Sequence, residues 1–184
     1  MKSLWQIVAL AGALATIACR GDVYERYGTT VHDDVDAAMA AAFRMTARLQ
    51  LTVVHNRIPN DSLAVVATIV TQAAHAVRER AVDFAAVTPP PDLAEPHAAL
   101  SAELSRLADA LDAMGSTFQR CAAADSAADA TGRACEAHLA ALSSQFGYVG
   151  EDLRTARSRV QRSLLPHGVM LLPISSRGGT RRTG

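Results

Sequence analysis

The sequence is poor in aromatic residues, in lysine and in net charge. Phe, Trp and Tyr make up only 4% of the 184 residues, Lys2 is the only lysine, and the formal net charge is zero. A formal net charge of zero argues against a protein that binds a polyanion, so we expect no nucleic-acid partner. Its arginines are also not interleaved with aromatic side chains on which bases could stack.

The common catalytic motifs are missing as well. The sequence has no G-x-S-x-G nucleophile elbow, no H-E-x-x-H zinc motif and no phosphate-binding loop. The run from Arg133 to His138 lacks the second cysteine of a haem attachment motif. The Glu-x-x-His pair of di-iron helical bundles is absent too. We therefore predict that the chain is not an enzyme and that it holds no cofactor and no metal.

The first 19 residues have the layout of an export signal. A short basic start, Met1 to Ser3, precedes an apolar run from Leu4 to Ala18 in which Gln6 is the main polar interruption. A run of about 15 residues is too short to span a bilayer as a helix, which needs about 20. It does match the length of a signal-peptide core, so we expect residues 1–18 to be a signal peptide.

The end of this segment resembles the lipobox of bacterial lipoproteins. Small residues, Ala15 to Ala18, lead directly into Cys19. In that family the cysteine is diacylated through its sulfur and becomes the new N-terminus. The resemblance covers residues 1–19 only and implies lipid attachment at Cys19, with the protein anchored in the cell envelope and facing the periplasm or the exterior. Two acyl chains are enough for a stable anchor.

The lipobox match has one departure. The family usually has Leu, Val or Ile three positions before the cysteine, where this chain has Thr16. Ordinary signal-peptidase cleavage after Ala18 or Ala15 is therefore the alternative, and it would release a soluble secreted protein.

The cysteine count agrees with acylation. Three cysteines in an exported chain leave one unpaired. If Cys19 carries lipid, then Cys121 and Cys135 remain and can form a disulfide in an oxidising compartment. The closed loop of about 15 residues would add about 3 kcal/mol of stability. The alternative is a pair of free, buried thiols.

Apolar residues recur at steps of three and four along four stretches, which predicts an all-α fold. The expected helices cover residues 33–57, 62–86, 92–121 and 134–164, and proline-containing connections favour an up-down-up-down four-helix bundle. Asp33, Asp34 and Asp36 would fill the first turn of the first helix. The expected divisions are a signal peptide at 1–18, a tether at 19–31, the bundle at 32–165 and a flexible tail at 166–184.

Three details of the bundle can be predicted from its topology. The acidic start of the first helix should lie level with the arginines near the end of the fourth. Gly147 and Gly150 should mark a kink or a close helix contact. The apolar segment from Val169 to Leu172 could dock on the bundle, although it belongs to the tail.

Histidines are the remaining candidates for a binding site. His97 occupies a position in the apolar seam of the third helix, where the plain interpretation is a partly buried, hydrogen-bonded histidine. His55 and His138 should lie at one level on adjacent helices, and we favour two surface histidines there over a metal site. As low-ranking candidates, the three could contact a ligand between the helices.

Two functions follow from these observations. The favoured one is a lipid-anchored helical bundle of the cell envelope with a non-catalytic interaction or structural role. Its partners would be the membrane, through acylated Cys19, and another envelope protein or a cell-wall component. The alternative is a carrier of a small ligand, metal or haem between the helices.

Overall fold

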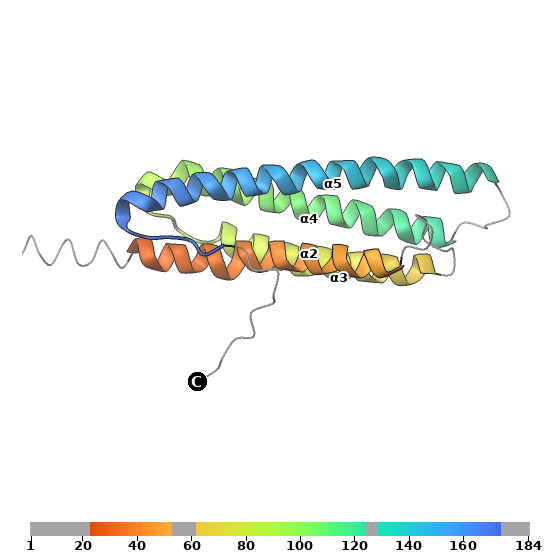
Figure 1. The fold of residues 1–184 in the computed structure, drawn as a ribbon, viewed down its shortest axis with the longest axis horizontal. Helices are drawn as coiled ribbons and strands as arrows, with labels where there is room; N and C mark the ends of the chain where they lie inside the picture. The colour runs from red at the N-terminus through yellow and green to blue at the C-terminus, as the bar shows by residue number, and fades with distance from the viewer. Residues whose placement is uncertain (1–22, 53–61, 124–128, 174–184) are drawn as a thin grey trace, which may run out of the picture.

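The protein is an elongated all-α bundle in the computed structural model, which describes residues 23–52, 62–123 and 129–173 (Figure 1). Four long helices follow one another up and down the rod within these ranges. The predicted fold class is therefore confirmed. No helix in the described part of the chain combines the length and the apolar character needed to cross a membrane.

The helix bounds follow the sequence pattern closely in the middle of the chain. Residues 23–30 are α-helical and lead into the π-helical segment η1 (Val31–Asp36) and then α2 (Ala37–Thr52), so residues 23–52 make one continuous first helix. The second long helix is α3 (Leu63–Ala85), and the short η3 (Pro91–Leu93) leads into α4 (Ala94–Ala123). The last is α5 (Asp129–Leu164), which ends in the 3-10 turn η4 (Leu165–His167).

The first helix begins earlier than predicted, so the boundary between tether and bundle at residue 31 is wrong. Tyr24, Tyr27 and Val31 are buried and extend the apolar stripe by two turns toward the N-terminus. Consequently Asp33, Asp34 and Asp36 do not lie in the first turn of a helix, and the helix dipole is not what stabilises them. The start of α5 also lies five residues before the predicted start at 134.

Side chains from all four helices form one continuous apolar core. Phe84 of α3, Leu100 and Leu104 of α4, and Leu153 of α5 are fully buried in it. Met45 and Met114 are buried core residues, as expected of flexible gap-filling side chains. The pairs α3–α4 and α4–α5 pack along most of their length.

The predicted flexible tail is wrong for residues 166–173, which pack against the bundle. Gly168 has φ of 76°, the left-handed conformation that glycine adopts most easily, and it turns the chain back along the rod. Residues 168–173, here called the C-terminal strap, then run between α5 and the first helix (Figure 1). Leu171 is buried in the core cluster, so the docking expected for Val169 to Leu172 is confirmed.

Close helix contact occurs at a different glycine from the two predicted. A Cβ atom built on Gly115 would lie 2.9 Å from Thr71 Oγ1, so α3 and α4 approach closely at this point. A Cβ atom on Gly147 or Gly150 would meet nothing within 4 Å. The expectation of a close contact at Gly147 and Gly150 is therefore wrong.

Candidate functional site

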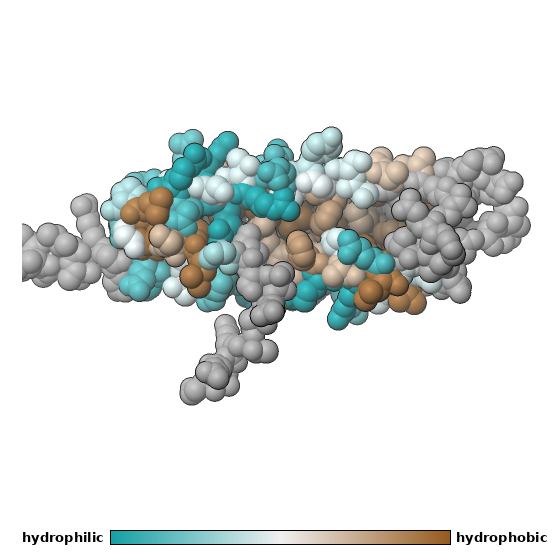
Figure 2. Space-filling model, in the orientation of Figure 1, coloured by the Kyte–Doolittle hydropathy of each residue, from teal (hydrophilic) through white to brown (hydrophobic). Residues whose placement is uncertain are grey.

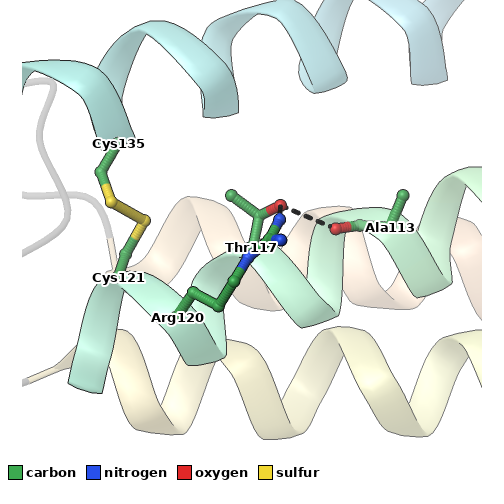
Figure 3. The surroundings of a disulfide bond; sticks show 5 residues. All are labelled: Ala113, Thr117, Arg120, Cys121 and Cys135. Atoms are coloured by element: carbon green, nitrogen blue, oxygen red, sulfur yellow. Dashed lines mark hydrogen bonds between the residues drawn. A yellow bond between two sulfur atoms is a disulfide. The ribbon is translucent and has the colours of Figure 1, made fainter. Parts of the chain in front are cut away.

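A disulfide joins α4 to α5 near the end of the rod opposite residue 23. The sulfur atoms of Cys121 and Cys135 are bonded, with 5.9 Å between the two Cα atoms and a sequence separation of 14. Figure 3 shows the bridge beside Thr117, whose hydroxyl donates to the carbonyl of Ala113 at 2.9 Å and accepts from Arg120 at 3.0 Å. The pairing is the one that the cysteine count predicted.

His97 lies at the other end of the bundle, which we call the proximal end, and it is buried among aromatic rings. Its Nδ1 atom is 3.1 Å from the hydroxyl of Tyr27, and its ring lies 4.6 Å from the ring of Phe84. Burial lowers the pKa of His97 and raises the pKa of Tyr27. A neutral imidazole can accept the hydrogen bond of the phenol, so the plain interpretation of a buried, hydrogen-bonded histidine fits this geometry.

A second set of aromatic and ionisable groups closes the proximal end. Tyr24 donates a hydrogen bond of 2.8 Å to Asp92 Oδ1, and His167 Nε2 lies 3.0 Å from Asp92 Oδ2. The rings of Tyr24 and His167 stack with 3.5 Å between centroids. Burial raises the pKa of Asp92, but the hydrogen bonds from Tyr24 and His167 outweigh it and bring the pKa below the usual value. These contacts tie together the first helix, η3 and the end of α5.

The π-helical segment places two aspartates against two different helices. Asp34, Val35 and Asp36 are all buried, although they are consecutive. A π-helix has more residues per turn than an α-helix, so a run of three covers a narrower arc of the helix surface. Val35 can thus face the core while Asp34 reaches Arg80 of α3 at 3.2 Å and Asp36 reaches α5. Burial raises the pKa of Asp34, and Arg80 only partly offsets this.

Asp36 and Arg157 form the most buried ion pair of the described chain. Arg157 Nε donates to Asp36 Oδ1 at 2.6 Å, and its Nη2 donates to Oδ2 at 2.8 Å. The two side chains are only 6% and 11% exposed. His32 Nδ1 is also 3.1 Å from Asp36 Oδ2. The predicted proximity of the acidic residues and the α5 arginines is therefore confirmed at Arg157, which makes the bidentate contact that suits a guanidinium.

The same arginine holds the C-terminal strap. Arg157 Nη2 donates to the carbonyl oxygen of Leu172 at 2.7 Å. Gln161 accepts from the backbone N–H of Leu171 at 2.5 Å and lies 3.4 Å from the carbonyl of Val169, to which its amide donates. Because side chains alternate along an extended segment, Val169 and Leu171 face the bundle and Met170 faces away.

An open cleft of about 630 Å³ lies between α5 and the strap. Its lining includes Arg154, Arg157 and Arg162 with one carboxylate, Glu151, and the apolar side chains of Leu165 and Met170. Arg154 also contacts Glu151 at 2.6 Å, in an exposed ion pair of the kind that contributes little to stability. The cleft thus combines apolar side chains with three arginines, of which Arg154 and Arg157 are paired with carboxylates.

The structure does not bring the predicted candidate residues together. Cys19 and His55 lie outside the described residues, so neither the lipid site nor the pairing of His55 with His138 is tested. His138 is exposed on α5, and His97 is at the other end of the bundle. Within residues 23–52, 62–123 and 129–173, no group of three or more His, Cys, Asp or Glu side chains is placed to hold a metal ion.

Sequence reasoning missed the polar and aromatic contacts of the proximal end. Tyr24 and Tyr27 fall in the predicted tether, although their spacing to Val31 continues the stripe of the first helix. Extending that stripe backwards would have found them. The contacts of Asp92 with Tyr24 and His167 had no such signal, because the three residues are far apart in the sequence and meet only in the folded chain.

Comparison with known proteins assigns the chain to no family. No protein-family model matches the chain, and searches of curated proteins and of solved structures return no significant match.

Proposed function

We propose that the protein is an exported, lipid-anchored helical bundle of the cell envelope with a non-catalytic binding role. The observation that carries this proposal is the Cys121–Cys135 disulfide. Disulfides persist in oxidising compartments and are rare in the cytosol. The bridge also accounts for two of the three cysteines, and the one that remains, Cys19, directly follows the signal-like segment.

The roles of the buried polar residues support a non-catalytic function. Asp34, Asp36 and His97 are buried, and each contacts a side chain of another helix. Such contacts hold helices in register, because removing one partner leaves a buried polar group unsatisfied. The ionisable groups of the core are thus engaged in stabilising the bundle.

Exposed apolar side chains support a binding role. Phe43 and Leu51 of α2 are 61% and 86% exposed, and Tyr148 of α5 is 74% exposed. Figure 2 shows apolar surface along the middle of the rod, between the upper helix α5 and the lower helix α2. Extended apolar surface of this kind commonly marks a contact with another macromolecule, and we propose an envelope protein or a cell-wall component as the partner.

The anchor can be tested by acyl labelling of the full chain expressed in a bacterium. An alkyne-tagged fatty acid should label the wild type and should fail to label Cys19→Ala. The matched control is the double variant Cys121→Ser and Cys135→Ser, which should keep the label because those sulfurs are not acyl acceptors. Label retained by Cys19→Ala would contradict the anchor.

Intact mass of the protein from the membrane fraction tests the same proposal independently. We expect the loss of residues 1–18, the gain of acyl mass and a deficit of two hydrogens from the disulfide. An unacylated soluble form that begins after Ala15 or Ala18 would instead support the secreted alternative.

A further inference from the structure

Four large apolar side chains are exposed around the proximal end of the bundle. Val23 is the first described residue of the first helix, Leu165 follows α5, and Met170 and Leu172 lie in the C-terminal strap. Their exposed fractions are between 43% and 75%. The stacking of Tyr24 on His167 brings the start of the first helix beside the end of α5. At this end, on the left in Figure 2, brown apolar side chains border teal hydrophilic ones.

The outward orientation of two of these side chains is imposed by specific bonds. Gln161 and Arg157 hold the backbone of the strap at Val169, Leu171 and Leu172. Because Leu171 is buried, its neighbours Met170 and Leu172 must point to the opposite side. The bundle therefore presents apolar side chains on a segment that it fixes in place.

Basic side chains accompany this apolar surface. The cleft beside the strap is lined by Arg154 and Arg162, both exposed, together with Leu165 and Met170, and also by Glu151, which pairs with Arg154. Arginine beside exposed apolar side chains is the composition of surfaces that lie on anionic bilayers, where apolar groups enter the interface and guanidinium groups meet phosphate.

The proposed anchor places a membrane at this same end. Residue 23 is the first that the structure describes, and an acylated Cys19 would be separated from it by four Cα–Cα steps, which span at most about 14 Å. This distance is short compared with a helix such as α5, whose 36 residues extend about 54 Å. A bundle tethered so closely has its proximal end at the bilayer surface.

We propose that the proximal surface, formed by Leu165, Met170, Leu172 and the arginines of the cleft, binds directly to anionic lipid. The cleft would receive a headgroup phosphate, and the apolar side chains would enter the interface. This inference rests on the proposed anchor for its geometry, but the contact surface itself is built from residues that the structure describes.

An environment-sensitive fluorophore tests the contact in the intact protein. The label is attached at Met170→Cys in the acylated chain, which is then reconstituted in vesicles of phosphatidylethanolamine with roughly one third phosphatidylglycerol. The matched control label is at Val65→Cys, an exposed valine in the first turn of α3 at the far end of the rod. We expect a blue-shifted emission and quenching by a lipid-borne quencher at 170, and a water-like emission at 65. Equal, water-like emission at both positions would overturn the proposal.

The failure of the anchor and the failure of the lipid contact are distinguishable. If intact mass shows an unacylated chain, the same labelled protein is mixed with the vesicles and floated. Flotation with a blue shift at 170 would support the lipid contact although the anchor had failed, and absence of flotation would overturn the lipid contact as well.

The arginines are tested by replacing Arg154 and Arg162 with Gln in an unacylated chain that floats. This double variant should bind the vesicles at least about tenfold more weakly, since each arginine near an anionic surface contributes on the order of a factor of five. Unchanged partitioning would overturn the role of the arginines.

Discussion

Arg157 is the residue whose loss should destabilise the protein most through electrostatics. It neutralises Asp36 in a nearly buried pair and also holds the strap. Replacing it removes the cation but leaves the carboxylate in a position that water hardly reaches. The cost then comes from the buried charge that remains.

We expect Arg157→Ala to lower the free energy of unfolding by about 3 kcal/mol, measured by urea denaturation at neutral pH. The matched control is Arg159→Ala, an exposed arginine of the same helix, which should change stability by less than about 0.5 kcal/mol. Similar small losses in both variants would show that the Asp36 carboxylate does not need its partner.

The stability of the protein should depend on pH through His97. Burial holds the pKa of His97 below its ordinary value of 6.5, so the unfolded chain binds a proton that the folded chain resists. Stability contributed by the neutral histidine is therefore complete above pH 6.5 and is lost as the pH falls below that value toward the folded pKa.

We expect the free energy of unfolding, measured by urea denaturation, to fall between pH 7.5 and pH 5.5. This fall should be larger for the wild type than for His97→Gln, whose new side chain does not titrate. The exposed His75 supplies the control, because His75→Gln should retain the pH dependence of the wild type. Identical pH dependence in the wild type and His97→Gln would contradict the assigned role of burial.

Helices α4 and α5 differ in the space around a glycine, at Gly115 of α4 and at Gly147 of α5. Ala is favoured over Gly inside a helix by about 1 kcal/mol, provided that space exists for the methyl group. Gly147 has that space on α5, whereas at Gly115 the new methyl group would press on Thr71 of α3.

We expect Gly147→Ala to raise the free energy of unfolding by about 0.5–1 kcal/mol. Gly115→Ala gains the same helix propensity but displaces the Thr71 side chain, so it should be less stable than Gly147→Ala by at least about 1 kcal/mol. Thermal and urea denaturation of both variants measure this difference. Equal stability would show that Thr71 of α3 moves aside without loss of stability.

The C-terminal strap is an element held mainly by side chains of α5. We expect Gln161→Leu to expose the backbone N–H of Leu171 and to accelerate its hydrogen exchange by about fivefold, because a net hydrogen bond contributes about 1 kcal/mol. Ser163→Ala, on the same helix, is the control and should leave this exchange unchanged. If exchange at Leu171 is equally slow in both variants, apolar packing alone holds the strap.

At the scale of the whole molecule, the disulfide fixes α5 to α4 at the end far from residue 23. Its effect is expected to come largely from restricting the unfolded chain, where the two cysteines would otherwise separate freely. At the proximal end, Asp92 just before α4 contacts His167 just after α5, and Asp36–Arg157 joins the first helix to α5.

We expect reduction of the disulfide to lower the free energy of unfolding by about 3 kcal/mol, the value for a loop of about 15 residues. The double variant Cys121→Ser and Cys135→Ser should match the reduced wild type and should not respond to reductant. Wild-type stability that is unchanged by complete reduction would contradict this role.

Much of the architecture could be predicted because it depends on local periodicity. The bounds of α3 and the seam of α4 follow directly from apolar spacing and flanking prolines. Predictions failed where a local pattern had two interpretations. Asp33, Asp34 and Asp36 resembled the acidic first turn of a helix, but Tyr24 and Tyr27 carry the helix further back, and burial decided between the two.

The all-α class and the order of the helices could be predicted from the sequence alone, because periodicity and helix breakers are properties of the linear chain. The cysteine count favoured the pair Cys121–Cys135, and the structure contains that disulfide. Three features became apparent only in the folded chain: Arg157 pairs with Asp36, Tyr24 and His167 share Asp92, and the strap returns to the bundle. These contacts join residues distant in the sequence, and their geometry depends on how the helices rotate and pack. Acylation of Cys19 is proposed from the sequence, whereas the surface that would lie on the membrane beside it forms only when the chain is folded.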